Sequence, residues 1–144
     1  MTRFLLAILA YLIPTFALGF VWHLVLFAHA YEALGIYRSD IIIPFGFLSM
    51  LIQAVLFAGV YHAWFAPAAG GFVRRAALYG GFGAVLSWSF TTLAVAAKNV
   101  MASVPDYLLI ETGFTLAQWM MVAPLTALAL VVPRGAVGTI ARKA

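Results

Sequence analysis

The chain has 144 residues, of which 66% are hydrophobic and only 8% are charged. In an average soluble domain about a quarter of the residues are charged, so this composition excludes a soluble globular protein. The absence of cysteine excludes disulfides, thiolate metal sites, iron–sulfur clusters and cysteine nucleophiles.

Four apolar stretches follow one another along the chain, at residues 4–30, 41–65, 76–97 and 107–132. Each is longer than the ~20 residues that a helix needs to cross a bilayer. Because the connections are short, consecutive helices are expected to lie antiparallel to each other. The sequence therefore predicts an all-α fold, with residues 1–144 forming one polytopic transmembrane domain built as a four-helix up-down bundle.

The first stretch is unusually long. A straight helix over residues 4–30 would measure about 40 Å, whereas the hydrocarbon core of a bilayer is about 30 Å thick. We therefore expect this helix to tilt, to bend near Pro14 or to project into the interface. The apolar part of a secretory signal has only about 7 to 15 residues, so the stretch is interpreted as a retained helix.

The third stretch and the start of the fourth carry local packing and capping signals. Ala76, Gly80 and Ala84 form a row of small residues, which allows close approach of a second helix. This row fits packing inside the bundle or a homodimer contact, and in both cases Gly80 should resist bulky replacement. The segment from Ser103 to Asp106 has the S-x-x-D form of a capping box before the fourth helix.

Lys and Arg residues lie mainly on one side of these stretches. Six are on that side: Arg3, Arg74, Arg75, Arg134, Arg142 and Lys143. Only Arg38 and Lys98 are on the other side. The positive-inside rule then predicts that both termini are cytoplasmic. Because the basic residues are spread over loops and tails, they indicate contact with membrane lipid and no nucleic-acid partner.

Glu111 is the one formally charged residue inside a predicted membrane helix. Intramembrane acids usually mark function, so Glu111 is a candidate proton or cation site; the alternative is a carboxylate that reaches up to the interface or is held protonated. His23 lies at a similar predicted depth. The two side chains are able to form a pair that holds one proton, or His23 is neutral and bonded to a Thr or a backbone carbonyl.

A polar stripe continues below Glu111 on the fourth helix. Thr115 and Gln118 follow it at i+4 and i+7 and so share its face. Gln53 of the second helix has the same predicted depth as Gln118. A hydrogen bond between helices at this level would contribute about 1 kcal/mol to their association. Structural bonding is the favoured interpretation, and lining of a narrow polar cavity is the alternative.

Several aromatic residues fall at informative depths. Tyr31, Tyr37 and Tyr107 lie near the predicted outer interface, which is typical of an aromatic belt. Trp88 and Trp119 lie near mid-membrane instead, where the indole N–H needs a partner. Core packing is the favoured role for both indoles, and lining a slot for an apolar ligand is the alternative.

No strong metal, cofactor or catalytic motif is present. His29 and Glu32, at i and i+3, are weak metal candidates at the membrane edge. His23 and His29 are six residues apart and would point about 240° apart on a regular helix, so an unbroken helix excludes their sharing one ion. We expect no cofactor and assign no catalytic residue.

The run Gly19-Phe20-Val21-Trp22-His23, followed by Leu26-Phe27, Tyr31 and Gly35, resembles the first helix of small bacterial four-helix integral membrane proteins. Those families are classed as domains of unknown function. The fourth stretch, from Tyr107 through Gly113 to Trp119, is similar in style. The resemblance implies a four-helix fold in the bacterial cytoplasmic membrane, and it carries over no functional residue.

These features favour a small membrane protein without enzymatic activity that binds a partner subunit or an apolar small molecule within the membrane. The alternative is a transport component, coupled to protons or cations, in which Glu111 acts with His23, Gln118 and Thr115 and which works as a homodimer or with a partner subunit. An enzyme that acts on lipid at the outer face is a third hypothesis.

Overall fold

The computed structural model describes residues 1–130, and within this range every element is a helix. Four helices are long and apolar enough to cross a membrane: Thr2–Leu26, Ile43–Phe65, Phe72–Ala96 and Val104–Ala129. The predictions of an all-α fold and of four membrane-crossing helices are confirmed. The chain is accordingly a multi-pass membrane protein.

Three of these four membrane helices change from α-helical to π-helical winding along their length. The elements in chain order are α1 (Thr2–Val21), η1 (Trp22–Leu26), α2 (Ala28–Leu34), α3 (Ile43–Val60), η2 (Tyr61–Phe65), α4 (Phe72–Ser87), η3 (Trp88–Leu93), α5 (Ala94–Ala96) and α6 (Val104–Ala129). The η segments are wide π-helical turns, as the hydrogen bonds from Phe27 N to Trp22 O and from Ala66 N to Tyr61 O show.

The first stretch is not one helix to residue 30, as predicted, but ends at Leu26. Phe27 leaves the helical conformation, with φ of −113° and ψ of 16°. The separate helix α2 follows and ends at Gly35, whose φ of +70° suits a glycine. Pro14 lies inside α1 without ending it. The first stretch is longer than the bilayer core requires, and the break at Phe27, after a π-helical turn, accommodates the additional residues. The chain changes direction at this break, between α1 and α2.

The third and fourth helices begin earlier than predicted. The third starts at Phe72 instead of residue 76, so Arg74 and Arg75 belong to its first turn. The fourth starts at Val104 instead of residue 107, with Ser103 as its cap: the backbone N–H of Asp106 donates to Ser103 Oγ over 3.4 Å. The predicted end of this helix at residue 132 lies outside the described residues.

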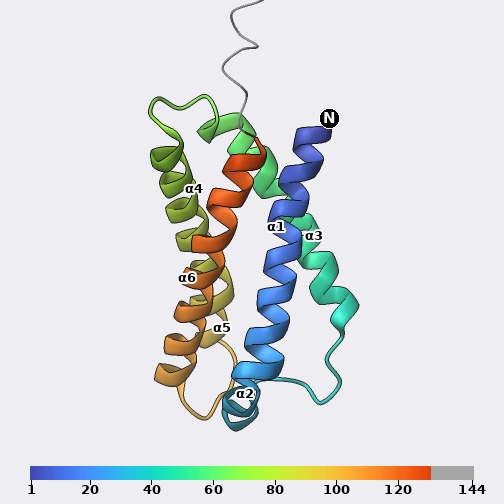
Figure 1. The fold of residues 1–144 in the computed structure, drawn as a ribbon. Helices are drawn as coiled ribbons and strands as arrows, with labels where there is room; N and C mark the ends of the chain where they lie inside the picture. Colours follow the sequence, from blue (N-terminus) through green and yellow to red (C-terminus); the bar gives the residue numbers. More distant parts are fainter. Residues whose placement is uncertain (131–144) are drawn as a thin grey trace, which may run out of the picture.

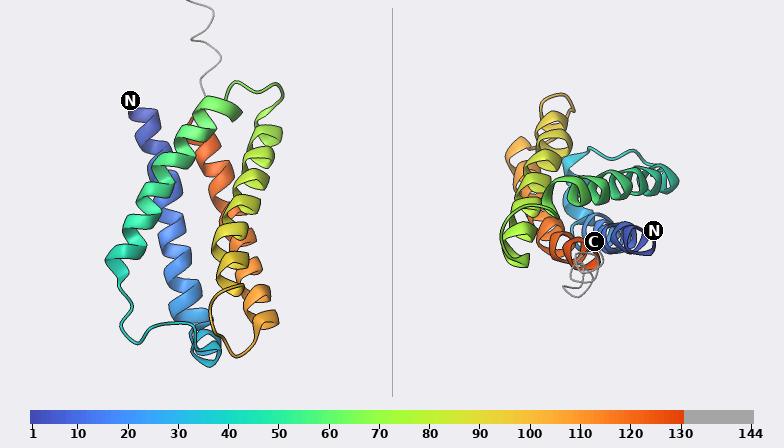
Figure 2. Two further views of the ribbon diagram at one scale, coloured as in Figure 1. Left: turned by 180° about the vertical axis from the view of Figure 1, so that it is seen from behind. Right: turned by 90° about the horizontal axis from the view of Figure 1, so that it is seen from above.

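The four long helices do not contribute equally to the bundle. α6 lies between α1 and α4 and packs against both, whereas α3 packs mainly against α1. In Figure 1 and in the rear view of Figure 2, the end of α3 nearest α2 leans away from the other helices. Many large apolar side chains point outward, among them Phe45, Leu109 and Met120. A lipid-facing surface explains this exposure, because lipid is the solvent for the outer faces of membrane helices.

Candidate functional site

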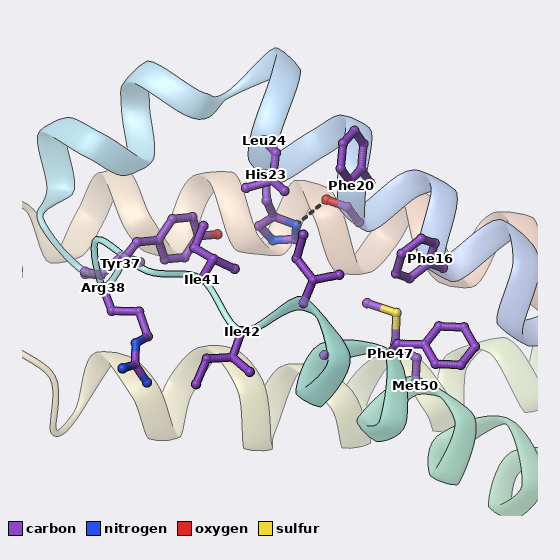
Figure 3. A pocket seen from close by; sticks show the side chains of 14 residues that line it. Phe16, Phe20, His23, Leu24, Tyr37, Arg38, Ile41, Ile42, Phe47 and Met50 are labelled. Atoms are coloured by element: carbon purple, nitrogen blue, oxygen red, sulfur yellow. Dashed lines mark hydrogen bonds between the residues drawn. The ribbon is translucent and has the colours of Figure 1, made fainter.

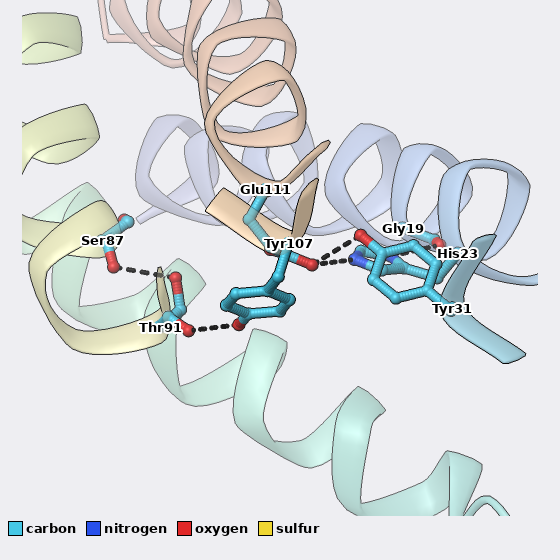
Figure 4. A network of polar contacts seen from close by, with 7 residues as sticks. All are labelled: Gly19, His23, Tyr31, Ser87, Thr91, Tyr107 and Glu111. Carbon is cyan, nitrogen blue, oxygen red and sulfur yellow. Dashed lines mark hydrogen bonds and ion pairs between the residues drawn. The ribbon is translucent and has the colours of Figure 1, made fainter. Parts of the chain in front are cut away.

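The structure brings Glu111 and His23 together. Glu111 lies on the buried face of α6 and is 7% exposed. The π-helical turn η1 carries His23, whose Nε2 is 3.3 Å from Glu111 Oε1, while its Nδ1–H donates to the Gly19 carbonyl over 2.8 Å (Figure 4). Sequence depth alone predicted that this pair was possible. The rotation of the two helices makes it a contact.

Tyr31 completes this cluster, which we call the Glu111 cluster (His23, Tyr31 and Glu111). Because the chain breaks at Phe27, α2 folds back and the Tyr31 hydroxyl donates to Glu111 Oε1 over 2.5 Å. Burial raises the pKa of the Tyr31 phenol far above its ordinary value, and the bond to Glu111 raises it further. Tyr31 therefore stays protonated and acts as a donor.

The hydrogen bonds of the Glu111 cluster fix its proton count. A carbonyl oxygen only accepts, so the bond to Gly19 requires a proton on His23 Nδ1. A second proton must then lie between Nε2 and Glu111 Oε1, because two facing acceptors would repel. Oε1 also accepts from Tyr31 at a length typical of a charge-assisted bond. The geometry therefore gives a pair that shares one proton between His23 Nε2 and Glu111 Oε1.

Aromatic rings surround the Glu111 cluster. The His23 ring lies 4.5 Å from the ring of Phe114 and 5.0 Å from that of Tyr31. Tyr37, from the segment after α2, stacks on Tyr31 with ring centres 4.8 Å apart. On the other side of Glu111, the Tyr107 hydroxyl donates to the Thr91 carbonyl over 3.0 Å (Figure 4). The rings pack on His23, and Tyr31 links the pair to Tyr37.

A groove of about 460 Å³ lies beside His23, between α1 and the leaning end of α3. Its lining residues are Phe16, Gly19, Phe20, His23, Leu24, Ile36, Tyr37, Arg38, Ile41, Ile42, Ile43, Gly46, Phe47 and Met50. In Figure 3, Phe16 of α1 faces Phe47 and Met50 of α3, with His23 further along the wall and Arg38 at one end. Phe20 and Phe47 are more than 40% exposed, so the groove opens at the side of the bundle.

A second polar cluster lies deeper, where the sequence placed Gln53 and Gln118 at one level. The two amides do not bond to each other directly. Tyr11 of α1 joins them: its hydroxyl donates to Gln53 Oε1 over 3.0 Å and accepts from Gln118 Nε2 over 3.2 Å. Gln118 also donates to Thr15 over 3.4 Å, and Gln53 donates to Ser49 over 3.1 Å. These contacts fit the interpretation that the polar side chains at this depth hold the helices together.

The remaining candidates on α4 and α6 have separate surroundings. The Trp119 indole is buried, donates to Ser87 Oγ over 3.1 Å and packs against Gly83. The Trp88 indole donates to Thr112 over 2.9 Å. Trp88 also lines a cavity of about 280 Å³ together with the buried Thr115. The burial of Trp119 fits the favoured interpretation of core packing, while the alternative of a slot for an apolar ligand stays a prediction.

The metal candidates do not join a larger site. His29 Nδ1 is 3.7 Å from Glu32 Oε2, and both side chains are almost fully exposed. Among the described residues, no group of three or more His, Cys, Asp or Glu side chains is close enough to hold a metal ion. The break at Phe27 removes the regular-helix restriction on His23 and His29, but His23 faces Glu111 and His29 faces outward.

Sequence reasoning missed Tyr31 and Tyr11. Tyr31 was assigned to the aromatic belt, because an unbroken first helix would carry it past the level of Glu111. Tyr11 was not singled out, although Thr15 at i+4 shares its face and gives the first helix a polar side at this level. A search of α1 for a donor at the depth of the two Gln amides would have found Tyr11. The break that positions Tyr31 has no comparable mark in the sequence.

Comparisons with protein families, curated proteins and solved structures found no match to this chain. The resemblance to small bacterial four-helix membrane proteins therefore stays a prediction. The Glu111 cluster and the groove beside it are the features that indicate a function.

Proposed function

We propose that this protein binds an apolar small molecule within the membrane, in the groove between α1 and α3, and performs no covalent chemistry. We place it in the bacterial cytoplasmic membrane as an up-down four-helix bundle with both termini cytoplasmic. The distribution of Lys and Arg supports this orientation. The end of the bundle that contains the groove and the Glu111 cluster then faces the outer side.

The observation that carries the proposal is the groove itself. Its volume of about 460 Å³ lies within the range of about 300 to 1,000 Å³ typical of small-molecule sites. Most of its lining is aromatic or aliphatic, and the few polar groups are gathered towards one end, as in sites that orient a ligand. A site of this kind suits a ligand that enters sideways from the lipid.

The Glu111 cluster supports the same proposal, because it holds two walls of the groove in place. His23 is a lining residue and is bonded to Glu111. Tyr37 is another, and it stacks on Tyr31, which donates to the same carboxylate oxygen. A preformed site loses less conformational entropy on binding than a flexible one. The buried carboxylate thus has a role in binding without touching the ligand.

Filling the groove with a side chain tests the proposal. Gly46 lines the groove, and a Cβ built on it meets nothing within 4 Å, so Gly46→Leu should fold normally and occupy the space of the ligand. Gly59→Leu is the matched control, because Gly59 is on the same helix, is equally open and does not line the groove. We expect native mass spectrometry from lipid nanodiscs to show a bound small molecule in wild type and Gly59→Leu and its loss in Gly46→Leu. An identical set of bound molecules in all three proteins would overturn the proposal.

A second candidate function is proton-coupled transport, and the shared proton of His23 and Glu111 favours it. Glu111→Gln separates the two functions. The amide oxygen of a Gln can still accept the bond from Tyr31, but the neutral amide has no proton to exchange with His23. Transport would require that this variant, reconstituted in liposomes, lose all pH-driven flux. The binding function instead predicts that Glu111→Gln retains its ligand, and retained flux would remove the transport hypothesis.

A further inference from the structure

Arg38 marks one end of the groove. Among the described residues that line it, Arg38 is the only Lys or Arg. His23 offers no free ring nitrogen to a ligand, because Nδ1 donates to Gly19 and Nε2 faces Glu111. A charged or polar end of a ligand would therefore be recognised at Arg38, while the rest of the molecule lies among the aromatic and aliphatic side chains.

The guanidinium of Arg38 is occupied by a carboxylate from the same chain. Its Nε donates to Asp40 Oδ1 over 2.9 Å and its Nη2 donates to Asp40 Oδ2 over 3.1 Å. Two parallel bonds of this kind are the arrangement in which arginine recognises a carboxylate. Both side chains are well exposed, at 60% and 72%. Exposed ion pairs contribute little to stability, so exchange of Asp40 for another carboxylate has a small cost.

We propose that the groove binds a single-chain carboxylate amphiphile, of the fatty-acid type, whose carboxylate replaces Asp40 on Arg38. This inference rests on the proposed function and names the class of ligand. The apolar chain would run from Arg38 along His23 towards Phe16 and Met50. His23 and Phe16 are seven residues apart on one helix, which corresponds to about 10 Å of groove for the chain. Asp40 acts as an internal competitor that keeps Arg38 oriented when no ligand is bound.

Photo-crosslinking with two matched probes tests the ligand class. The first probe is a 12-carbon carboxylic acid with a diazirine in its chain, and the second is the corresponding alcohol. Both are applied at pH 8, where the acid is ionised, to the full chain in phosphatidylcholine nanodiscs. We expect the acid to label peptides of α1 and α3 that line the groove. Its labelling at low probe concentration should exceed that of the alcohol by up to about fivefold, the ratio that one exposed ion pair supplies.

Three variants assign the effect to single residues. Arg38→Gln should reduce labelling by the acid to the level of the alcohol and leave the alcohol unchanged. Asp40→Asn should increase labelling by the acid, because it removes the competitor from Arg38. Lys98→Gln removes the other basic residue of the predicted outer side and should change neither probe. An Asp40→Asn variant that labels no better than wild type would contradict the exchange on Arg38.

The same experiment separates this inference from the function on which it rests. If Gly46→Leu prevents labelling by both probes but acid and alcohol label wild type equally, the groove binds apolar molecules and the carboxylate class is wrong. If Gly46→Leu labels as wild type does with both probes, the proposed function itself is wrong. A dodecyl phosphate diazirine that labels more strongly than the acid would replace the carboxylate with a phosphate and overturn the inference.

Discussion

The α4–α6 pair and the α1–α3 pair are built from similar apolar residues, yet their helices pack differently. Both pairs border a hollow, of about 430 Å³ along α4 and α6 and of about 460 Å³ between α1 and α3. Along α4 and α6, small residues face a large one: Gly83 lies against the Trp119 indole, and a Cβ on Gly80 would lie 3.0 Å from that of Ala123. Along α1 and α3, large side chains such as Phe16 and Phe47 face each other near the leaning end of α3. Small residues let α4 and α6 approach closely at Gly80 and Gly83, whereas bulky side chains separate α1 from the leaning end of α3.

This difference separates a closely packed region from the region where we propose that a ligand binds. In lipid, helix association depends on close van der Waals packing and on hydrogen bonds between helices. The α4–α6 pair has the close packing. The α1–α3 pair depends on the hydrogen bond from Tyr11 to Gln53 and on the rings of Tyr11 and Phe57, which stack 5.5 Å apart. At the leaning end of α3, the side that faces α1 borders the groove and has few other contacts. Changes in the two pairs should therefore have different consequences.

The largest effect is expected from Gly83→Ala, which disrupts the close packing of α4 against α6. The new Cβ would overlap the Trp119 ring, which is held by Ser87 and by neighbouring rings, including that of Phe57 at 4.8 Å. Overpacking of this kind costs about 1 to 3 kcal/mol. We expect the free energy of unfolding, measured by SDS titration in detergent micelles, to fall by that amount.

Gly81→Ala gives the opposite sign and serves as the control. Gly81 lies two residues away on the same helix, and a Cβ there meets nothing within 4 Å. Replacing a glycine inside a helix by alanine normally stabilises the helix by about 1 kcal/mol. The variant should therefore unfold at the same or a higher SDS fraction than wild type. Two variants of equal stability would show that the α4–α6 pair is not as closely packed as described.

Composition and spacing were sufficient to predict the four membrane helices, because apolar length is a direct requirement of the bilayer. They also placed Glu111 level with His23 and Gln53 level with Gln118. Helix rotation was indicated only for the fourth helix, whose polar stripe of Glu111, Thr115 and Gln118 is buried. The other helices carry too few polar residues to show which face contacts lipid. The second helix shows this: it is apolar on nearly all sides, and only Ser49 and Gln53 hint at the direction of the bundle.

The break at Phe27 was the main obstacle to predicting the site. Neither Pro nor Gly marks it, and the apolar run continues through it. Contacts from distant parts of the chain favour the break: Tyr31 bonds to Glu111, and the Leu34 carbonyl accepts from the backbone N–H of Ala102 over 3.0 Å. Such contacts override local helix propensity. The walls of the groove that follow α2, including Tyr37 and Arg38, were therefore not recognised as part of a site.

A smaller loss of stability is expected from Tyr11→Phe, which removes the hydrogen bond that joins α1 to α3. The variant removes the donor to Gln53 and the acceptor for Gln118 but keeps the ring and its packing. Hydrogen bonds between membrane helices average about 0.6 kcal/mol and reach about 1.7. We expect a loss of roughly 1 kcal/mol in the free energy of unfolding by SDS titration.

A double-mutant cycle with Gln53→Leu isolates the bond between Tyr11 and Gln53, because the Gln118 contact is lost equally with and without Gln53. A coupling energy near zero would show that the bond between Tyr11 and Gln53 does not hold α3 against α1. Packing between the rings of Tyr11 and Phe57 would then account for the position of α3 beside the groove.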